Sequence, residues 1–242
     1  MIGRQDNDLG SMKNFIITVL LIFLAQANAG DGRWGELYRS HTFESFERYA
    51  PALKAIDMSQ IDYPLLHAAV FHETNRVRRR HGLPEFRHSE ALERAGKAHS
   101  DDMVRLDFFD HTSPVKGKRS LADRLAAVGI THCAMAENIA ETFGLAYEPG
   151  KPVYPPAQNG GYFSYTVGGE PIPPHTYRSL AQAVVKQWLE SEGHRKNILN
   201  PNLLFLGVGA AHFVDRKFGN MDRFRLTQCF AGRNTQKTVT KQ

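Results

Sequence analysis

The 242-residue sequence predicts an α+β fold in which helices come first along the chain and strands follow. Apolar residues recur at helical spacing over much of residues 63–128, whereas residues 206–211 and 224–230 are expected to form strands. A run of helices followed by a run of strands fits a three-layer α/β/α sandwich. The composition agrees, because 42% hydrophobic and 23% charged residues are ordinary for a globular protein of one domain.

Residues 1–29 have the features of a signal peptide. Lys13 precedes an apolar run from Phe15 to Ala25, and Ala27-Asn28-Ala29 is a small-x-small cleavage pattern. The apolar run has about 11 residues, whereas a transmembrane helix needs about 20. We therefore expect cleavage after Ala29, no transmembrane segment in the mature chain, and a secreted or periplasmic protein. An uncleaved membrane anchor is the alternative.

Basic residues are scattered, although the formal net charge is +5. The one cluster, within residues 76–80, is typical of a solvated helix face and lacks the interleaved aromatic residues of a single-strand-binding groove. We therefore expect no nucleic-acid partner. Residues 30–62 show no clear period and are expected to form an N-terminal extension.

Three helices are expected over residues 63–81, 90–106 and 121–128. The glycine and proline that follow the first are typical helix stops. Ser89 and Ser120 are good N-cap residues for the other two. His99, on the inner face of the second helix, is expected to be a core histidine, with a ligand role as the alternative. A strand from Cys133 to Ile139 follows.

Residues 144–178 form a Pro/Gly/Tyr-rich insertion that holds seven of the twelve prolines and five of the eight tyrosines. A loop of this length is either functional or disordered. Its composition cannot build a core, so we expect it to be dispensable for folding. Ser179 is expected to cap a helix that ends near Gly193. Residues 234–242 form a polar tail.

The chain has two cysteines, Cys133 and Cys229. An even number of cysteines in an exported protein predicts one disulfide, here between two expected strands. It would close a long loop, for which the chain-entropy model gives roughly 4–5 kcal/mol. Two buried free thiols are the alternative.

Four motifs, taken together and in order, carry a resemblance to a known family. They are FDHTSP at 109–114, AENIA at 136–140, Trp188 with GHRKNILNP at 193–201, and GVG at 207–209 with TQ at 227–228.

This series resembles the bacterial branch of the CAP superfamily, the SCP-like domain shared by cysteine-rich secretory, antigen 5 and pathogenesis-related proteins. The resemblance covers roughly residues 65–232, and we place the CAP/SCP-like domain at 63–233. It implies an antiparallel sheet between layers of helices.

The resemblance also implies a cleft. Eukaryotic members have two histidines and two glutamates there, and some bind a divalent metal. His111 and Glu137 match the first histidine and the first glutamate.

The other two positions depart from the eukaryotic pattern. Ser191 occupies the position of the second glutamate, and its neighbours are Glu190 and Glu192. Arg225 occupies the position of the second histidine. His194 is expected to occupy similar space, although a histidine at a helix end also gains about 0.3–1 kcal/mol from the helix dipole.

His111 and Glu137 can also be paired from their chemistry alone. Glu137 interrupts an apolar strand, and a buried carboxylate must be partnered. A histidine on a loop above the sheet is an economical donor, so we expect the two side chains to meet. Such a pair can bind a metal, act as acid and base, or hydrogen-bond for structural reasons alone.

The expected function is that of an exported binding module that holds a lipid, glycan, metal or protein partner through this cleft. The alternatives are a metal-dependent hydrolase using the same cleft and an envelope-associated structural protein. No His-Glu-x-x-His, Gly-x-Ser-x-Gly or phosphate-binding loop occurs, so no residue is assigned a catalytic role. A divalent metal such as Zn²⁺, held by His111 and His194, is the cofactor considered.

Overall fold

The computed structural model describes residues 35–234. The chain divides into two compact units, residues 1–41 and 42–242. In the first, residues 35–39 are helical. The expected signal peptide and nearly all of the polar tail lie outside the described residues. Everything below concerns the second unit.

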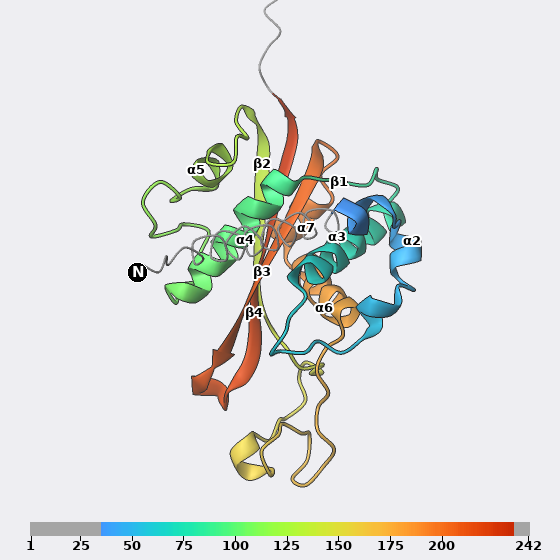
Figure 1. Cartoon of the computed structure of the whole chain (residues 1–242), viewed down its shortest axis with the longest axis vertical. Coiled ribbons are helices and arrows are strands. Elements are labelled where there is room, and N and C mark those ends of the chain that lie inside the picture. The colour runs from blue at the N-terminus through green and yellow to red at the C-terminus, as the bar shows by residue number, and fades with distance from the viewer. Residues whose placement is uncertain (1–34, 235–242) are drawn as a thin grey trace, which may run out of the picture. The chain divides into compact units, whose positions relative to one another are not determined.

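A four-stranded sheet forms the centre of this unit, in the order β1-β3-β4-β2 (Figure 1). Both β2 and β3 pair with β4 in antiparallel fashion, and the short β1 adds a parallel pair at the edge of β3. The predicted central antiparallel sheet is therefore confirmed. The strands are β1 (Arg87–His88), β2 (Cys133–Phe143), β3 (Leu203–Asp215) and β4 (Met221–Asn234).

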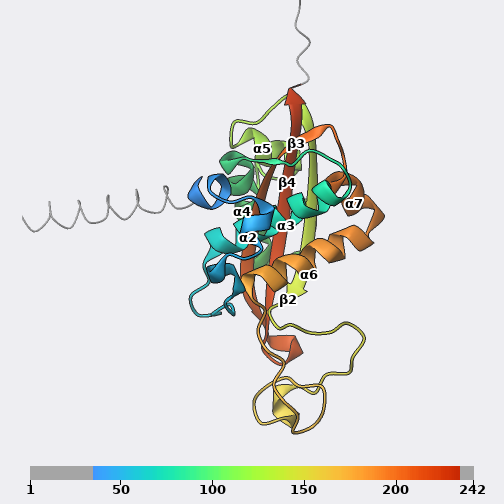
Figure 2. The same ribbon diagram turned by 90° about the vertical axis from the view of Figure 1, so that its right-hand side faces the viewer.

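Helices cover both faces of the sheet (Figures 1 and 2). They are α2 (Phe43–Phe46), α3 (Tyr63–Arg80), α4 (Glu90–Arg105), α5 (Leu121–Ala126), α6 (Tyr177–Glu190) and α7 (Glu192–Ile198), with short 3₁₀ turns at Ala50–Leu53, Pro156–Gln158 and Arg216–Phe218.

Two neighbouring residues of β4 show that α3 and α4 lie on opposite faces. Thr227 hydrogen-bonds Ser100 of α4, whereas Gln228 donates to Thr74 of α3. Successive side chains of a strand point to opposite faces. The three-layer sandwich is thus confirmed.

The helix caps follow the sequence closely. Ser89 and Ser120 cap α4 and α5 as expected, each accepting from a backbone N–H in the first turn. The expectation that Ser179 caps the next helix is wrong. Thr176 is the N-cap of α6, and Ser179 is its reciprocal partner one turn later in a capping box.

The Gly207-Val208-Gly209 motif lets α4 lie directly on the sheet. A Cβ atom at Gly207 would overlap the backbone of Leu92 and Glu93, and one at Gly209 would overlap the backbone of α4 at Lys97. The two glycines therefore stand where no larger side chain fits.

Strand β2 is an edge strand whose outward-facing carbonyl groups are hydrogen-bonded by side chains of α6 and α7. The donors and acceptors are Asn197 Nδ2 to Glu137 O at 3.3 Å, Trp188 Nε1 to Ile139 O at 3.0 Å and Gln187 Nε2 to Glu141 O at 3.4 Å.

The predicted disulfide is wrong, because Cys133 and Cys229 are free thiols. The register places Cys229 opposite Glu137, four positions along β2 from Cys133. Four residues of strand span roughly 13 Å, whereas bridged Cα atoms lie about 4.4–6.8 Å apart. Both cysteines instead pack in the apolar cluster around Leu92, and burial raises the pKa of each thiol.

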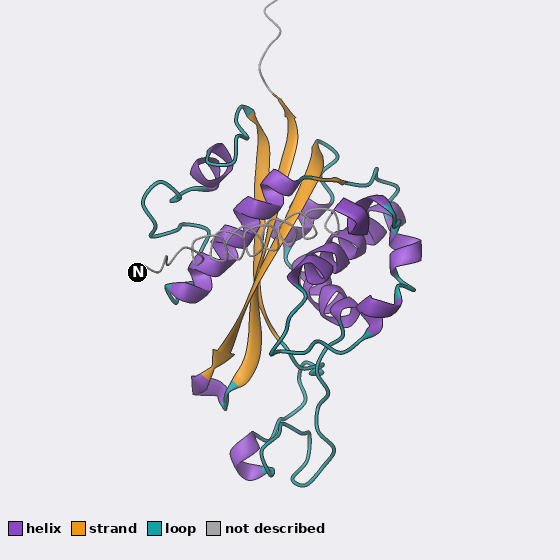
Figure 3. Ribbon diagram, in the orientation of Figure 1, coloured by secondary structure: helices purple, strands orange, loops and turns teal. Residues whose placement is uncertain are grey.

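The insertion is not structureless, although most of it is loop (Figure 3). Phe163 and Ile172 form a small apolar cluster with Met221 of β4, so the expectation that this segment builds no core is wrong. An isolated bridge between Leu145 and Pro174 closes its base. The insertion therefore packs as a small lobe against the hairpin that joins β3 and β4.

Candidate functional site

The predicted contact between His111 and Glu137 is confirmed. His111 lies in the loop after α4, Glu137 lies in β2, and Nδ1 of the histidine is 2.8 Å from Oε1 of the carboxylate across 26 positions of sequence. The Glu137 side chain is 3% exposed and the His111 side chain 53% exposed. A buried carboxylate thus holds a half-exposed imidazole by one of its two nitrogens.

Arg124 of α5 completes the pairing of Glu137. Its NH2 donates to Oε2 of Glu137 at 2.6 Å, and both side chains are almost fully buried. Its NH1 donates to the backbone carbonyl of His111 at 3.1 Å. One guanidinium therefore fixes both the carboxylate and the loop that carries the imidazole.

The pKa values reflect this arrangement. Burial alone would raise the pKa of Glu137, but the hydrogen bond with His111 and the charge of Arg124 outweigh it and hold that pKa below its ordinary value. The hydrogen bond to Glu137 raises the pKa of His111. The pair therefore stays charged over a wider pH range than either group alone.

His99 lies beneath this pair and is a core histidine, as expected. It is fully buried in α4, and its Nε2 is 3.1 Å from the Asp110 carbonyl and 4.0 Å from Glu137 Oε1. Burial lowers the pKa of His99, which favours the neutral ring. Nε2–H then donates to Asp110, and Nδ1 is left without a partner among the described residues.

His194 approaches the edge of β2 from the opposite face. Its carbonyl accepts from Asn138 Nδ2 at 3.2 Å, and Asn138 points away from Glu137. Burial, and then the charge of His111, lower the pKa of the His194 imidazole. The interpretation of His194 as a residue at a helix C-terminus is wrong, because it lies in the first turn of α7. Its expected share in ligand binding stays a prediction.

Glu190 and Glu192 lie on the outer surfaces of their helices. Their carboxylates are 68% and 71% exposed and face Lys186 and Lys196 at 3.9 and 2.7 Å. No contact described in the structure ties either of them to His111.

Arg225 shows what replaces the second histidine of the eukaryotic pattern. It lies on the same face of the sheet as Glu137. Its Nε donates to the Glu141 carboxylate at 2.8 Å, and its NH1 donates to the carbonyls of Met103 and Phe108 at 2.5 and 3.1 Å. Arg225 thus anchors the end of α4 and the start of the loop that leads to His111.

The donor set does not fit a divalent metal. Residues 35–234 hold no group of three or more His, Cys, Asp and Glu side chains placed to bind one. Both oxygens of Glu137 are already taken, and Arg124 adds a positive charge beside them. A structural Zn²⁺ needs four ligands and a catalytic one needs three.

The role of Arg124 was not predicted, although the sequence contains a signal for it. It shares one face of α5 with Leu121 and Leu125, which pack into the core. A charged residue on the apolar face of a short helix needs a buried partner.

Comparison with known protein families identifies the family of this chain. The profile of the cysteine-rich secretory protein family, CAP, matches residues 71–230. The chain therefore belongs to the CAP family. No helix in residues 35–234 is long and apolar enough to cross a membrane.

Two Bacillus subtilis proteins are similar in sequence. YkwD is 34% identical over 136 residues, 56% of this chain and 38% of that protein. The membrane protein YlbC is 31% identical over 145 residues, 60% of this chain and 30% of that protein. The chain thus covers about a third of the length of these relatives.

Similar solved structures include an extracellular SCP-domain protein from Bacillus anthracis. It is 26% identical with a TM-score of 0.47, over 73% of this chain and 43% of that one. A cysteine-rich secretory protein from Staphylococcus aureus is 15% identical with a TM-score of 0.39, over 71% of this chain and 40% of that one.

Proposed function

We propose that this CAP domain is an exported binding module whose ligand hydrogen-bonds to His111. One observation carries the proposal: Nδ1 of His111 is held by a buried carboxylate, while Nε2 has no partner among the described residues and the side chain is 53% exposed. An imidazole fixed in this way offers one directed hydrogen bond to a molecule arriving from solvent.

The charge of the site indicates the chemistry of the ligand. The pKa of His111 is raised, so its Nε2 is a donor over a wider pH range than in a free histidine. A ligand that binds the protonated ring therefore presents an acceptor, such as a carbonyl, phosphate or carboxylate oxygen of a lipid, glycan or protein. A hydrogen bond to a charged donor contributes about 1.5–3 kcal/mol.

The donor set gives no support to a metal-dependent hydrolase, because Arg124 takes the coordination site that a metal would need on Glu137. The signal peptide expected at residues 1–29 supports export, and membership of the CAP family agrees with it.

Native mass spectrometry of the exported protein, purified without chelator, tests the proposal. We expect a bound organic mass in the wild type that is lost in His111→Gln and retained in the control His81→Gln, which changes an exposed histidine at the end of α3. Absence of bound mass from the wild type, retention in His111→Gln, or stoichiometric Zn²⁺ would contradict it.

A further inference from the structure

A groove between α6 and the insertion lies apart from His111 and has a volume of about 470 Å³. Residues of four segments line it: Glu141, Thr142 and Phe143 from β2; Leu145, Tyr147, Pro149 and His175 from the insertion; Ala183, Lys186, Gln187 and Glu190 from α6; and Arg223 from β4. Ligand pockets typically enclose about 300–1,000 Å³. We propose that this groove binds a neutral oligosaccharide.

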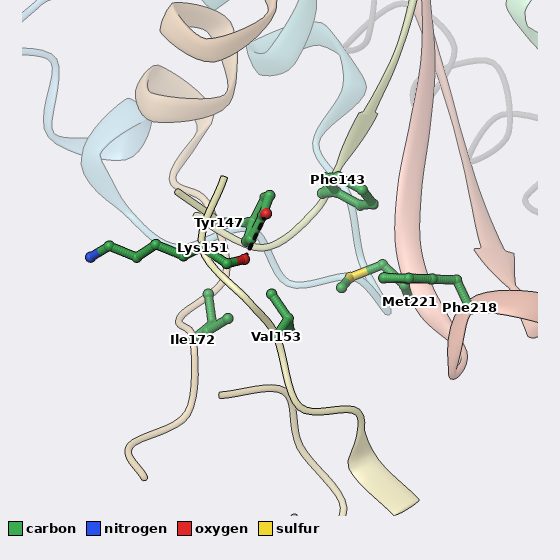
Figure 4. Close-up of a pocket in the computed structure, with 7 residues that line it drawn as sticks. All are labelled: Phe143, Tyr147, Lys151, Val153, Ile172, Phe218 and Met221. Carbon is green, nitrogen blue, oxygen red and sulfur yellow. Dashed lines mark hydrogen bonds between the residues drawn. The ribbon is translucent and has the colours of Figure 1, made fainter. Parts of the chain in front are cut away.

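Aromatic rings form one wall of the groove. Tyr147 packs edge-on against Phe143, with ring centroids 5.7 Å apart, and stacks on Tyr165 at 6.3 Å. Its hydroxyl donates to the Lys151 carbonyl at 2.9 Å (Figure 4). The ring is therefore fixed before a ligand arrives, which reduces the entropy lost on binding.

A fixed aromatic face suits a sugar ring, because the C–H groups of a pyranose are weakly positive and the aromatic face is negative. A second cavity of about 200 Å³ shares Phe143 and Tyr147, and apolar side chains such as Val153 and Ile172 line most of the rest of it (Figure 4). The two rings thus separate an apolar pocket from a groove of mixed polarity.

The charges that line the groove balance one another. Glu141 pairs with Arg223 at 2.6 Å, and Glu190 faces Lys186 at 3.9 Å. Two acidic and two basic side chains leave no net charge to attract an anion such as a phospholipid headgroup. The charged and polar side chains in the lining also disfavour an acyl chain, because burying these groups against hydrocarbon removes their water. A neutral ligand with many hydroxyl groups satisfies both conditions.

His175 provides a directed polar contact. The residue is 8% exposed, its Nδ1 is 2.8 Å from Ser179 Oγ, and Nε2 has no partner among the described residues. Burial lowers the pKa of His175 to about 4, so the ring is neutral at physiological pH. A neutral imidazole nitrogen in a groove pairs well with a hydroxyl group, which both donates and accepts.

Calorimetric titration of the full chain with tri-N-acetylchitotriose, cellotriose and maltotriose tests the proposal. We expect at least one trisaccharide to bind the wild type and to bind Tyr147→Ala at least tenfold more weakly. Tyr147→Phe keeps the ring but loses the hydrogen bond to Lys151, so it is expected to bind more weakly than the wild type and more tightly than Tyr147→Ala. Tyr162→Ala, a tyrosine of the insertion that lines neither cavity, is the matched control.

Two further variants keep the result interpretable. Gln187→Ala changes an exposed residue of α6 and is expected to weaken binding even if Tyr147→Ala disturbs the insertion. His111→Gln is expected to leave sugar binding unchanged, so the fate of this proposal is independent of the His111 proposal. Three results would overturn the proposal: no binding by the wild type, binding by both Tyr147→Ala and Gln187→Ala that is as tight as that of the wild type, or loss of binding in His111→Gln.

Discussion

Replacing Glu137 by glutamine should destabilise the fold strongly. The substitution keeps the shape of the side chain but removes the charge that Arg124 meets at 2.6 Å, where both side chains are at most 3% exposed. The amide can accept a hydrogen bond from only one of Arg124 and His111, because its NH2 group then faces the other donor. Breaking one partner of a buried pair costs about 3–5 kcal/mol, so we expect a loss of about 3 kcal/mol in the free energy of unfolding.

Urea unfolding followed by tryptophan fluorescence measures this loss. Glu190→Gln is the matched control, because its ion pair with Lys186 is 3.9 Å long and exposed, and exposed pairs contribute about 0–1 kcal/mol. A loss below about 1 kcal/mol in Glu137→Gln, at an unchanged slope of the unfolding curve, would refute the assignment of Glu137 as the group that neutralises Arg124.

The same pair predicts how stability depends on pH. The pKa of His111 is raised in the fold, so its contribution is complete below its unfolded pKa of about 6.5 and is lost as pH rises through the folded value. The pKa of Glu137 is lowered, so its contribution is complete above about 4.3 and is lost as pH falls through the folded value. An NMR titration of His111 should give an elevated pKa that returns toward the ordinary value in Glu137→Gln; an unshifted wild-type titration contradicts this.

Three further predictions concern the contact of α4 with the sheet, the state of the two cysteines and the insertion. Gly209→Ala should lower the free energy of unfolding by about 1–3 kcal/mol, measured by thermal unfolding, because the new Cβ overpacks against α4. Gly193→Ala, whose new Cβ would meet nothing within 4 Å, is the control and should be close to neutral. Equal effects of the two substitutions would contradict the close approach of α4. Thiol titration of the denatured, unreduced protein should find two reactive thiols, Cys133 and Cys229. Finding none would show that the two cysteines form a disulfide after all. Replacing residues 148–171 by a short Gly/Ser linker should leave cooperative unfolding intact, because the bridge at the base of the insertion lies outside the deletion; insoluble protein would count against this.

The order of the layers could be predicted from the sequence because helical spacing and strand-like runs are local properties. Ser89 and Ser120 cap helices for the same reason. The pairing of Cys133 with Cys229 could not be judged locally, since it depends on strand register. Export and an even number of cysteines predict a disulfide, but the strand register places the two thiols four residues apart along β2.

The candidate site was predictable in part. Glu137 is recognisable in the sequence as a charged residue in an apolar strand. Its contact with His111 follows because a buried carboxylate needs a hydrogen-bond donor. The second donor, Arg124, comes from a helix whose position over the sheet is a tertiary property. The groove at Tyr147 was not predicted, because its walls come from segments that meet only in the folded chain.

The side-chain cover over the outer edge of β2 has a consequence for how copies of this protein behave together. An unprotected edge strand is a template on which another chain can add a strand, and this is a common route to aggregation. Trp188, Gln187 and Asn197 occupy three successive carbonyls that such a strand would use. The tryptophan and asparagine of the family motif therefore occupy carbonyl groups that strand addition at this edge would require.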